Sequence, residues 1–134
     1  MQPLTVLSLH FDDGVLSCGG QIWETATAGG AVRVITLFAG AAPRPVPPFA
    51  EVQHRMWGDP PLPTALRRAE DHAAYCRLGC PDVHHLPIPD AVYRLSGSGT
   101  ARYGSEDAIF GPVHAEEQGA PPVLAELIRP LVLP

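Results

Sequence analysis

Three residues whose side chains can bind a metal or move a proton lie together near the start of the chain. Residues 7–20 read LSLHFDDGVLSCGG, with an imidazole at His10 and carboxylates at Asp12 and Asp13. An imidazole and a carboxylate are good ligands for zinc or another divalent ion, and a second carboxylate can take a proton from water bound to that ion. On a turning loop, His10 and Asp13 can converge while Asp12 points elsewhere. The pattern indicates a hydrolytic metal site, although helix capping by Asp12 or Asp13 explains it equally well.

The segments around this motif predict the start of an α/β fold. Residues 4–9 are mostly apolar, as in a buried strand, and residues 31–38 have the clearest strand pattern in the chain. Between them, residues 15–28 have helical spacing and end at the helix-stopping pair Gly29-Gly30. This order predicts two parallel strands joined by a helix. Because ligands of such sheets bind at the carboxyl ends of the strands, the motif lies where a site is expected.

The next segment is rich in proline. Residues 40–64 hold seven prolines, which we expect to exclude regular structure over most of this stretch. A loop of this length inside a compact domain is usually functional or disordered. Met56 and Trp57 are apolar side chains with which it can fold over a site.

A second helix and a third strand follow the proline-rich segment. The sequence from Thr64, as N-cap, to Gly79 predicts the helix, and residues 82–88 predict the strand. The stripe of this helix that we expect to be packed comprises Ala65, Ala69, Ala73, Cys76 and Leu78.

The remaining third of the chain has weaker signals. Residues 91–119 have no regular pattern, Pro121 and Pro122 suit the first turn of a helix, and residues 131–133 resemble the start of another strand. Repeated strands and helices predict one Rossmann-like domain over residues 1–134, with a mostly parallel sheet in three α/β/α layers.

The overall composition narrows the function classes. The chain has 134 residues, 46% of them hydrophobic, which is enough for one compact core. Its formal charge is −5 and all nine basic residues are arginine, so no basic run marks a nucleic-acid surface. No apolar stretch approaches the roughly 20 residues of a membrane helix. Three cysteines, and a start without a basic leader, favour a reduced, cytoplasmic protein without a signal peptide.

Three separated segments have the order of motifs in a known family. LSLHFDDGVLSCGG is similar to a signature written A-H-P-D-D-E, VRVITLFAG to a second strand, and LRRAEDHAAYCRLGC-PDVHHLPIPD to an R-x-x-E helix with a strand that ends in aspartate. Together they cover most of residues 4–90 and resemble the PIG-L/LmbE-like family of zinc-dependent N-deacetylases. The resemblance implies a Rossmann-like fold and metal-dependent hydrolysis of an N-acetyl group on a small amino-sugar conjugate.

The resemblance also implies roles for five residues. His10 and Asp13 would be ligands of Zn2+ or another divalent metal, and Asp12 would be the general base that activates water. Arg67 and Asp90 would bind the substrate.

The residues themselves leave alternatives open for the last two assignments. Arg67 can form a weak ion pair within its helix, with Glu70 or Asp71. Asp90 can be an acid of a turn after a proline.

The sequence departs from the family's signature at two positions. Phe11 replaces its proline and removes a fixed φ angle from the loop. Gly14 replaces its glutamate, which removes a supporting carboxylate and adds backbone freedom. Neither change removes a ligand, but both can weaken metal binding.

The family takes its third ligand from a histidine that follows a late strand. Residues 131–134 resemble that strand, and the sequence stops there, so we expect a fragment of a longer protein. Another histidine could substitute. At most one of His84 and His85 can face a site, because neighbours on a strand point to opposite faces. His114 lies in a polar stretch, and His54 lies in the proline-rich segment, where it can approach the substrate entrance.

Other functions are weaker alternatives. A structural zinc site could use Cys76, Cys80, His84 and His85, but the short C-x-x-C spacing is absent, and Cys76 fits a core position better. A nucleotide-binding domain would need a G-x-G-x-x-G turn, which the first strand lacks. A decayed, non-enzymatic binding module on the same fold is the main alternative. The expected partner is the small substrate, and a free sheet edge would also allow homo-oligomers.

Overall fold

The computed structural model describes residues 2–134. The elements in chain order are β1 (Leu4–Ser8), α1 (Asp13–Thr27), β2 (Val32–Thr36), α2 (Pro48–Met56), α3 (Pro63–Arg77), β3 (Val83–His85), η1 (Ala91–Tyr93), α4 (Glu106–Ile109), η2 (Ala115–Glu117), α5 (Ala120–Ile128) and η3 (Arg129–Leu131). The three strands form one parallel sheet in the order β1-β2-β3. This arrangement confirms the predicted α/β class and its strand–helix–strand start.

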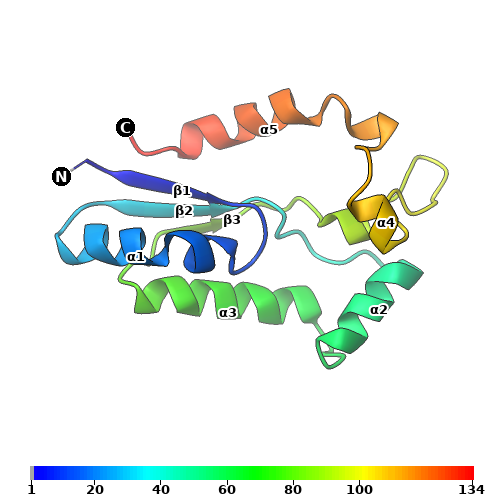
Figure 1. Ribbon diagram of the computed structural model, residues 1–134, viewed down its shortest axis with the longest axis horizontal. Helices are drawn as coiled ribbons and strands as arrows, with labels where there is room; N and C mark the ends of the chain where they lie inside the picture. The colour runs from blue at the N-terminus through cyan, green and yellow to red at the C-terminus, as the bar shows by residue number, and fades with distance from the viewer. Residues whose placement is uncertain (1) are drawn as a thin grey trace.

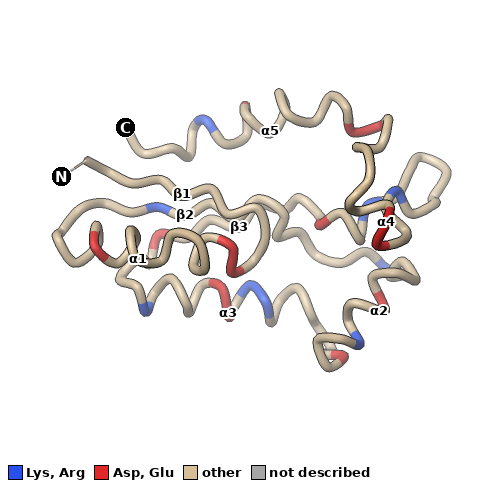
Figure 2. The backbone as a smooth tube through the Cα atoms, viewed as in Figure 1, with Lys and Arg blue, Asp and Glu red and all other residues tan. Residues whose placement is uncertain are grey.

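The helices lie on both sides of the sheet. Figure 1 shows α1 and α3 side by side against one face, and α5 on the opposite side. The core between the sheet and the helices α1 and α3 includes Val6, Ile22, Val34, Tyr75 and Cys80. Figure 2 shows β1 without charges, as expected for a strand of a small core.

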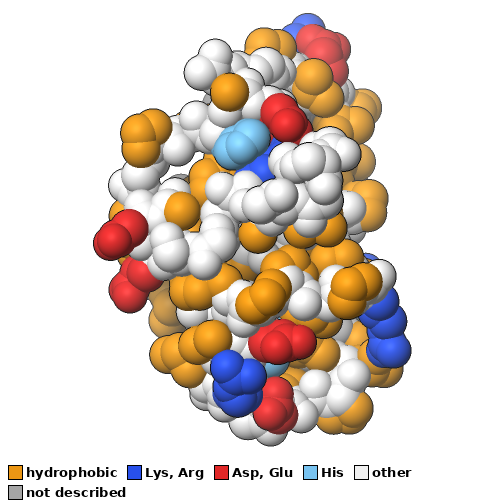
Figure 3. All heavy atoms as spheres, turned by 90° about the vertical axis from the view of Figure 1, so that its right-hand side faces the viewer, with side chains coloured by type: hydrophobic (Ala, Val, Ile, Leu, Met, Phe, Trp, Pro, Cys, Tyr) orange, Lys and Arg blue, Asp and Glu red, His pale blue; other side chains and the backbone are white. Residues whose placement is uncertain are grey.

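The register of the sheet places the strand ends side by side. Ser8 pairs with Thr36, and Thr36 pairs with His85. The chain segments that leave these three positions therefore emerge at one end of the sheet. The His10 motif, the turn after β2 and the approach to Asp90 all lie there, and Figure 3 views the molecule from this end.

The proline-rich segment contains a helix, which corrects the expectation of little regular structure there. Its prolines cluster at the two ends, and Pro48 occupies the first turn of α2, where a missing N–H does no harm. The stretch from Phe49 to Trp57 has no proline, so the helix can propagate through it.

The α3 helix begins two residues earlier than expected and buries a different face. Pro63 starts α3 and Leu62 is its N-cap, with no side-chain capping bond, so Thr64 is not the cap. The expected stripe was wrong for four of its five residues: Ala65, Ala69, Ala73 and Cys76 are exposed, whereas Leu78 packs against the core. Asp71 and Tyr75 are the buried residues. The face of α3 that packs against the sheet therefore contains the polar residue Asp71, which a prediction from hydrophobic spacing cannot place there.

The C-terminal part of the structure agrees in outline with the prediction from the sequence. Residues 91–119 are mostly irregular apart from the short helical segments η1, α4 and η2. The α5 helix begins at Ala120, and Pro121 and Pro122 lie in its first turn as predicted. The strand expected over residues 131–133 does not form: η3 ends at Leu131, and the following chain is bonded to β1 from Leu133 N–H to the Thr5 side-chain Oγ1 and not through a backbone ladder. Within residues 2–134, no helix is long and apolar enough to cross a membrane.

Candidate active site

The loop after β1 is shaped by one buried hydroxyl. Ser8 Oγ donates to the carbonyl of His10 over 2.8 Å and accepts the N–H of Gly14 over 2.9 Å. This serine satisfies a free N–H at the start of α1. Asp12 is the N-cap residue, but its side chain forms no capping bond, so capping does not explain the two aspartates.

His10 lies between two carboxylates. Its Nδ1 is 3.3 Å from Asp13 Oδ2, and its Nε2 is 3.4 Å from Asp90 Oδ2. The His10 backbone N–H also donates to Asp13 Oδ2, over 3.0 Å, which fixes that carboxylate against the loop. Because the two ring nitrogens lie on different edges of the imidazole, Asp13 and Asp90 flank His10 and do not meet at one point.

Asp12 points away from this group, as predicted. Its Oδ2 accepts a hydrogen bond of 2.9 Å from Arg67 Nη2. The Arg67 guanidinium also lies over the Trp57 ring, 5.6 Å from its centroid. Arg67 therefore pairs with the motif and not within its own helix. Trp57 lies beside the site, although it is 43% exposed, whereas Met56 is 74% exposed and does not line this cavity.

Asp90 has two functions in the local structure. Its Oδ1 accepts the Val92 N–H over 3.2 Å and caps η1, as the turn interpretation predicted, while its Oδ2 faces His10. Gly40 brings the neighbouring chain close: its N–H donates to the Ile88 carbonyl over 2.8 Å, and a Cβ at this position would lie 2.6 Å from the Ile88 carbonyl carbon. Only glycine allows this approach.

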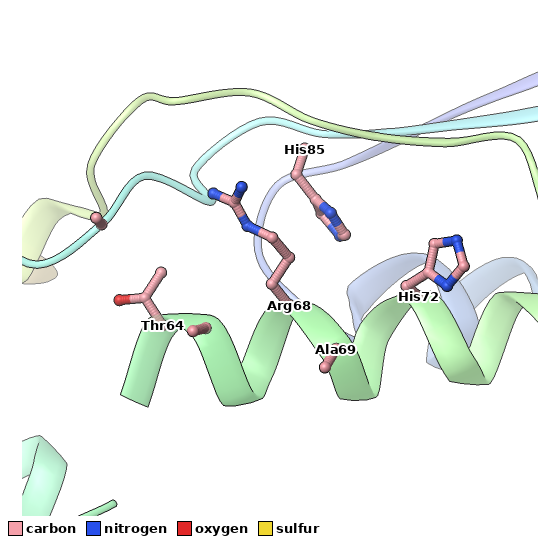
Figure 4. A pocket seen from close by; sticks show the side chains of 7 residues that line it. Thr64, Arg68, Ala69, His72 and His85 are labelled. Atoms are coloured by element: carbon pink, nitrogen blue, oxygen red, sulfur yellow. The ribbon is translucent and has the colours of Figure 1, made fainter. Parts of the chain in front are cut away.

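A small cavity of about 30 Å3 opens beside these groups, with a lining that includes Phe11, Phe38, Trp57, Arg67, Asp90 and Tyr93. A wider cavity of about 590 Å3 lies along α3. Figure 4 shows His85 pointing from its strand toward α3 in this second cavity, with Arg68 and His72 on the helix.

The other histidines do not join the site. His54 is buried, with its Nε2 2.7 Å from the Tyr93 hydroxyl, and His84 Nε2 lies 2.8 Å from Asp82 Oδ1. His85 bonds to Asp71 on the opposite face of the strand from His84. His114 accepts the Glu116 N–H at the start of η2.

The alternative zinc site does not assemble. The exposed Cys76 thiol lies 3.6 Å from His72 Nδ1, whereas the buried Cys80 donates to the Val32 carbonyl. More generally, no group of three or more histidine, cysteine, aspartate or glutamate side chains in residues 2–134 is placed to hold one metal ion.

Two donors of the motif nevertheless fit a divalent metal. Two ligand atoms bound to tetrahedral zinc at about 2.0–2.1 Å are separated by about 3.3 Å. His10 Nδ1 and Asp13 Oδ2 have that separation. An imidazole nitrogen and a carboxylate oxygen are also suitable donors for zinc, so this pair can supply two ligands.

The sequence did not identify Asp71 as a functional residue. Its carboxylate is fully buried and accepts the Asp12 N–H over 2.9 Å. Beside it, burial raises the pKa of Tyr75 above its ordinary value of 10, and the charges of Asp71 and Asp12 act in the same direction against the hydrogen bond of Ser8. The signal that could have found Asp71 is its spacing of four residues from both Arg67 and Tyr75, which puts all three on one helix face.

The fold and this strand-end site define a class: α/β proteins that carry a histidine–aspartate motif at the end of the first parallel strand. The model of the GlcNAc-PI de-N-acetylase family, PIG-L, matches residues 5–129. The chain belongs to this family, which confirms the resemblance seen in the sequence.

Relatives of known name agree with this membership. The chain is 30% identical over 117 residues to 2'-N-acetylparomamine deacetylase of Niallia circulans, which covers 78% of this chain and 42% of that protein. A teicoplanin-complexed deacetylase of teicoplanin biosynthesis superposes with a TM-score of 0.83 at 30% identity, covering 98% of this chain and 53% of its own. The zinc-inhibited form of teicoplanin deacetylase superposes with a TM-score of 0.70 at 37% identity. The match covers 75% of this chain and 38% of that one. The chain thus spans about half the length of these relatives or less.

Proposed function

We propose that this chain carries the metal-binding and proton-accepting part of an N-deacetylase that hydrolyses an acetamide on an amino-sugar conjugate. The observation that carries the proposal is the 3.3 Å separation of His10 Nδ1 and Asp13 Oδ2 beside an Asp12 carboxylate that Arg67 holds separately. A pair of metal ligands and a separate base at one strand end are suited to hydrolysis of an unactivated amide.

In the proposed reaction, water adds to the carbonyl carbon, the carbon–nitrogen bond breaks, and acetate and a free amine form. His10 and Asp13 would hold a divalent metal, which when bound polarises the carbonyl oxygen and makes water more acidic. Asp12 accepts the proton that the water loses and returns a proton to the leaving amine. Arg67 keeps the Asp12 carboxylate oriented for both transfers.

The substrate would enter between Asp90 and Trp57. The cavity there, about 30 Å3, matches the volume of roughly one water molecule, so a sugar ring requires the Trp57 segment to move aside. Asp90 Oδ2 then accepts a sugar hydroxyl, and Trp57 provides an apolar wall. The names of the relatives, which act on N-acetylparomamine and in teicoplanin biosynthesis, support an amino sugar within a larger conjugate.

The test is release of free amine from 2'-N-acetylparomamine in the presence of zinc. We expect Asp12→Asn to lower kcat by about 100-fold or more, because a general base contributes about 10²–10⁴-fold. Asp107→Asn, an exposed aspartate on α4, is the matched control and should keep full activity. Equal rates for Asp12→Asn and the parent would contradict the proposal.

The alternative, a non-enzymatic binding module, is favoured by one observation: two metal ligands, not three, are assembled in the part of the chain that the structure describes. Calorimetric zinc titration separates the two functions. A deacetylase site should bind zinc tightly and lose that binding in His10→Ala but not in His114→Ala. Weak binding that is the same in all three proteins would favour the module.

The proposed metal is Zn2+, and the proposed partner is the small conjugate. Homo-oligomerisation and a cytoplasmic location also stay predictions. Sedimentation velocity of the purified chain would test the first of them.

A further inference from the structure

The backbone of Asp12 adopts a conformation that needs support from outside its own loop. Its φ is 72° and its ψ is −18°, in the left-handed region that residues with a side chain rarely occupy. Such conformations persist where surrounding contacts fix them, and they occur often at functional sites. At Asp12, this conformation turns the carboxylate toward Arg67, while Asp13 faces His10.

The contact that fixes Asp12 comes from α3. Asp71 Oδ1 accepts the Asp12 backbone N–H over 2.9 Å, across 59 positions of sequence. The Asp71 side chain is 0% exposed, so its carboxylate has no water to satisfy it. A buried carboxylate is retained only where donors surround it.

The other two donors to Asp71 come from the sheet. Thr36 Oγ1 donates to Asp71 Oδ2 over 3.1 Å, and His85 Nε2 lies 2.8 Å from the same oxygen. Thr36 is fully buried at the end of β2, and the His85 side chain is 9% exposed at the end of β3. Figure 4 shows His85 directed toward α3. With Oδ2 held by two strands, Oδ1 has one orientation left, and that orientation meets Asp12.

We propose that Asp71 is a positioning residue for the general base: it holds the Asp12 backbone in its left-handed conformation, and Thr36 and His85 fix the orientation of the Asp71 carboxylate. This inference rests on the proposed function, because it assumes that Asp12 is the base. The reacting carboxylate of Asp12 would then be oriented by Asp71 and its bonds to the sheet, none of which touches the substrate.

A purely structural role for Asp71 makes a different prediction. In that case its removal would lower the stability of the fold, and activity measured on folded protein would not change. Asp71→Ala removes the acceptor. Asp71→Asn keeps an oxygen for the Asp12 N–H and an amide that can donate to Thr36 Oγ1 or to His85. Cys80→Ala is a matched control for lost stability, because Cys80 is buried in the core away from the motif.

The first readout is the division of the effect between kcat and KM, measured well below each variant's Tm. We expect Asp71→Ala to lower kcat about 100-fold with KM changed by less than about threefold, since a displacement of about 1 Å in a reacting group costs about this factor. Asp71→Asn should recover most of that loss, and Cys80→Ala should leave kcat unchanged. An unchanged kcat in folded Asp71→Ala would overturn the inference.

The second readout does not depend on activity. Amide hydrogen exchange at Asp12, followed by NMR, should be slow in the parent and at least tenfold faster in Asp71→Ala. The Val34 N–H, which donates to the Asp82 carbonyl, is the internal reference for global unfolding. Equal acceleration at both amides, or none at Asp12, would overturn the inference. If the parent has no deacetylase activity, the proposed function fails, and the exchange result still decides whether Asp71 holds Asp12.

Discussion

Arg67 and Asp12 form the ion pair that connects the third helix to the first strand end. The guanidinium donates to Asp12 Oδ2 over 2.9 Å and lies 5.6 Å from the centroid of the Trp57 ring. Arg67 is thus held between the proposed base and the segment that covers the site. The planar guanidinium makes both contacts at once, which a lysine cannot do.

Replacement of Arg67 should reduce activity, and the size of the loss should depend on whether the new residue keeps the positive charge. Arg67→Ala loses a charge-assisted hydrogen bond of about 1.5–3 kcal/mol, so we expect kcat/KM to fall by roughly 10–100-fold. Arg67→Lys keeps the charge and should fall by less. Arg77→Ala, at the exposed end of the same helix, serves as the control. Steady-state kinetics with zinc present would check this, and equal rates for Arg67→Ala and Arg77→Ala would contradict it.

The start of the fold could be predicted because each signal there is local. The strand from Leu4, the helix before Gly29-Gly30 and the strand from Val32 are all bounded by turn residues. Burial follows the apolar residues of β2, but in β1 the sequence does not predict that Leu7 is exposed and Ser8 is buried. The divergence of Asp12 from Asp13 could also be predicted, from the geometry of a turning loop.

The inner face of α3 could not be predicted in the same way. Alanines at regular spacing indicated a packed stripe, yet Asp71 faces the sheet, because donors from two distant strands and one loop satisfy it. That compensation involves residues more than 13 positions away, so no local pattern contains it. The α2 helix was missed for the opposite reason: apart from Pro48 in its first turn, the prolines of the segment lie outside the stretch that forms the helix.

Tyr75 lies so close to Gly14 that it leaves no room for a side chain at the position where the family signature has glutamate. A Cβ at Gly14 would overlap the Tyr75 hydroxyl, which lies over the start of α1. We expect Gly14→Ala to destabilise the fold by about 1–3 kcal/mol through overpacking. In a Tyr75→Phe background, which removes the clashing oxygen, the same change should cost clearly less. Urea denaturation of the four proteins in a double-mutant cycle measures this coupling, and additive effects would contradict it.

Gly40 should control the position of Asp90. Its Cβ would lie 2.6 Å from the Ile88 carbonyl carbon and 2.7 Å from the Pro89 nitrogen, so Gly40→Ala must push this chain away from the site. We expect KM to rise at least several-fold, with a smaller change in kcat, because Asp90 is proposed to bind the sugar. A KM that stays unchanged in Gly40→Ala would contradict the proposed role of Asp90 in substrate binding.

Gly20→Ala on α1 is the control for the glycine-to-alanine change, because a Cβ there meets nothing within 4 Å. It should stabilise the fold by up to about 1 kcal/mol.

The acid stability of the chain should depend on Glu117. This carboxylate is buried and accepts hydrogen bonds from Arg94 over 2.7 Å, Arg102 over 2.9 Å and Tyr103 over 3.0 Å. Burial alone would raise the pKa of Glu117, but the bond from Arg102, the charge of Arg94 and the bond from Tyr103 outweigh it and hold the pKa below its ordinary value of 4.5.

A lowered folded-state pKa fixes the sign of the pH effect. The stabilisation by Glu117 is complete above pH 4.5, the ordinary value, and is lost as the pH falls through the lower folded-state value. At pH 7, Glu117→Gln should lose about 1.5–3 kcal/mol, because it removes the charged acceptor of hydrogen bonds from Arg94, Arg102 and Tyr103. Its free energy of unfolding should then fall less than that of the parent below pH 4.5. Glu126→Gln breaks an exposed pair with Arg129 and should cost less than about 1 kcal/mol. Urea unfolding from pH 7 to pH 3 compares them, and parallel curves for Glu117→Gln and the parent would show that Glu117 carries no charge-dependent stability.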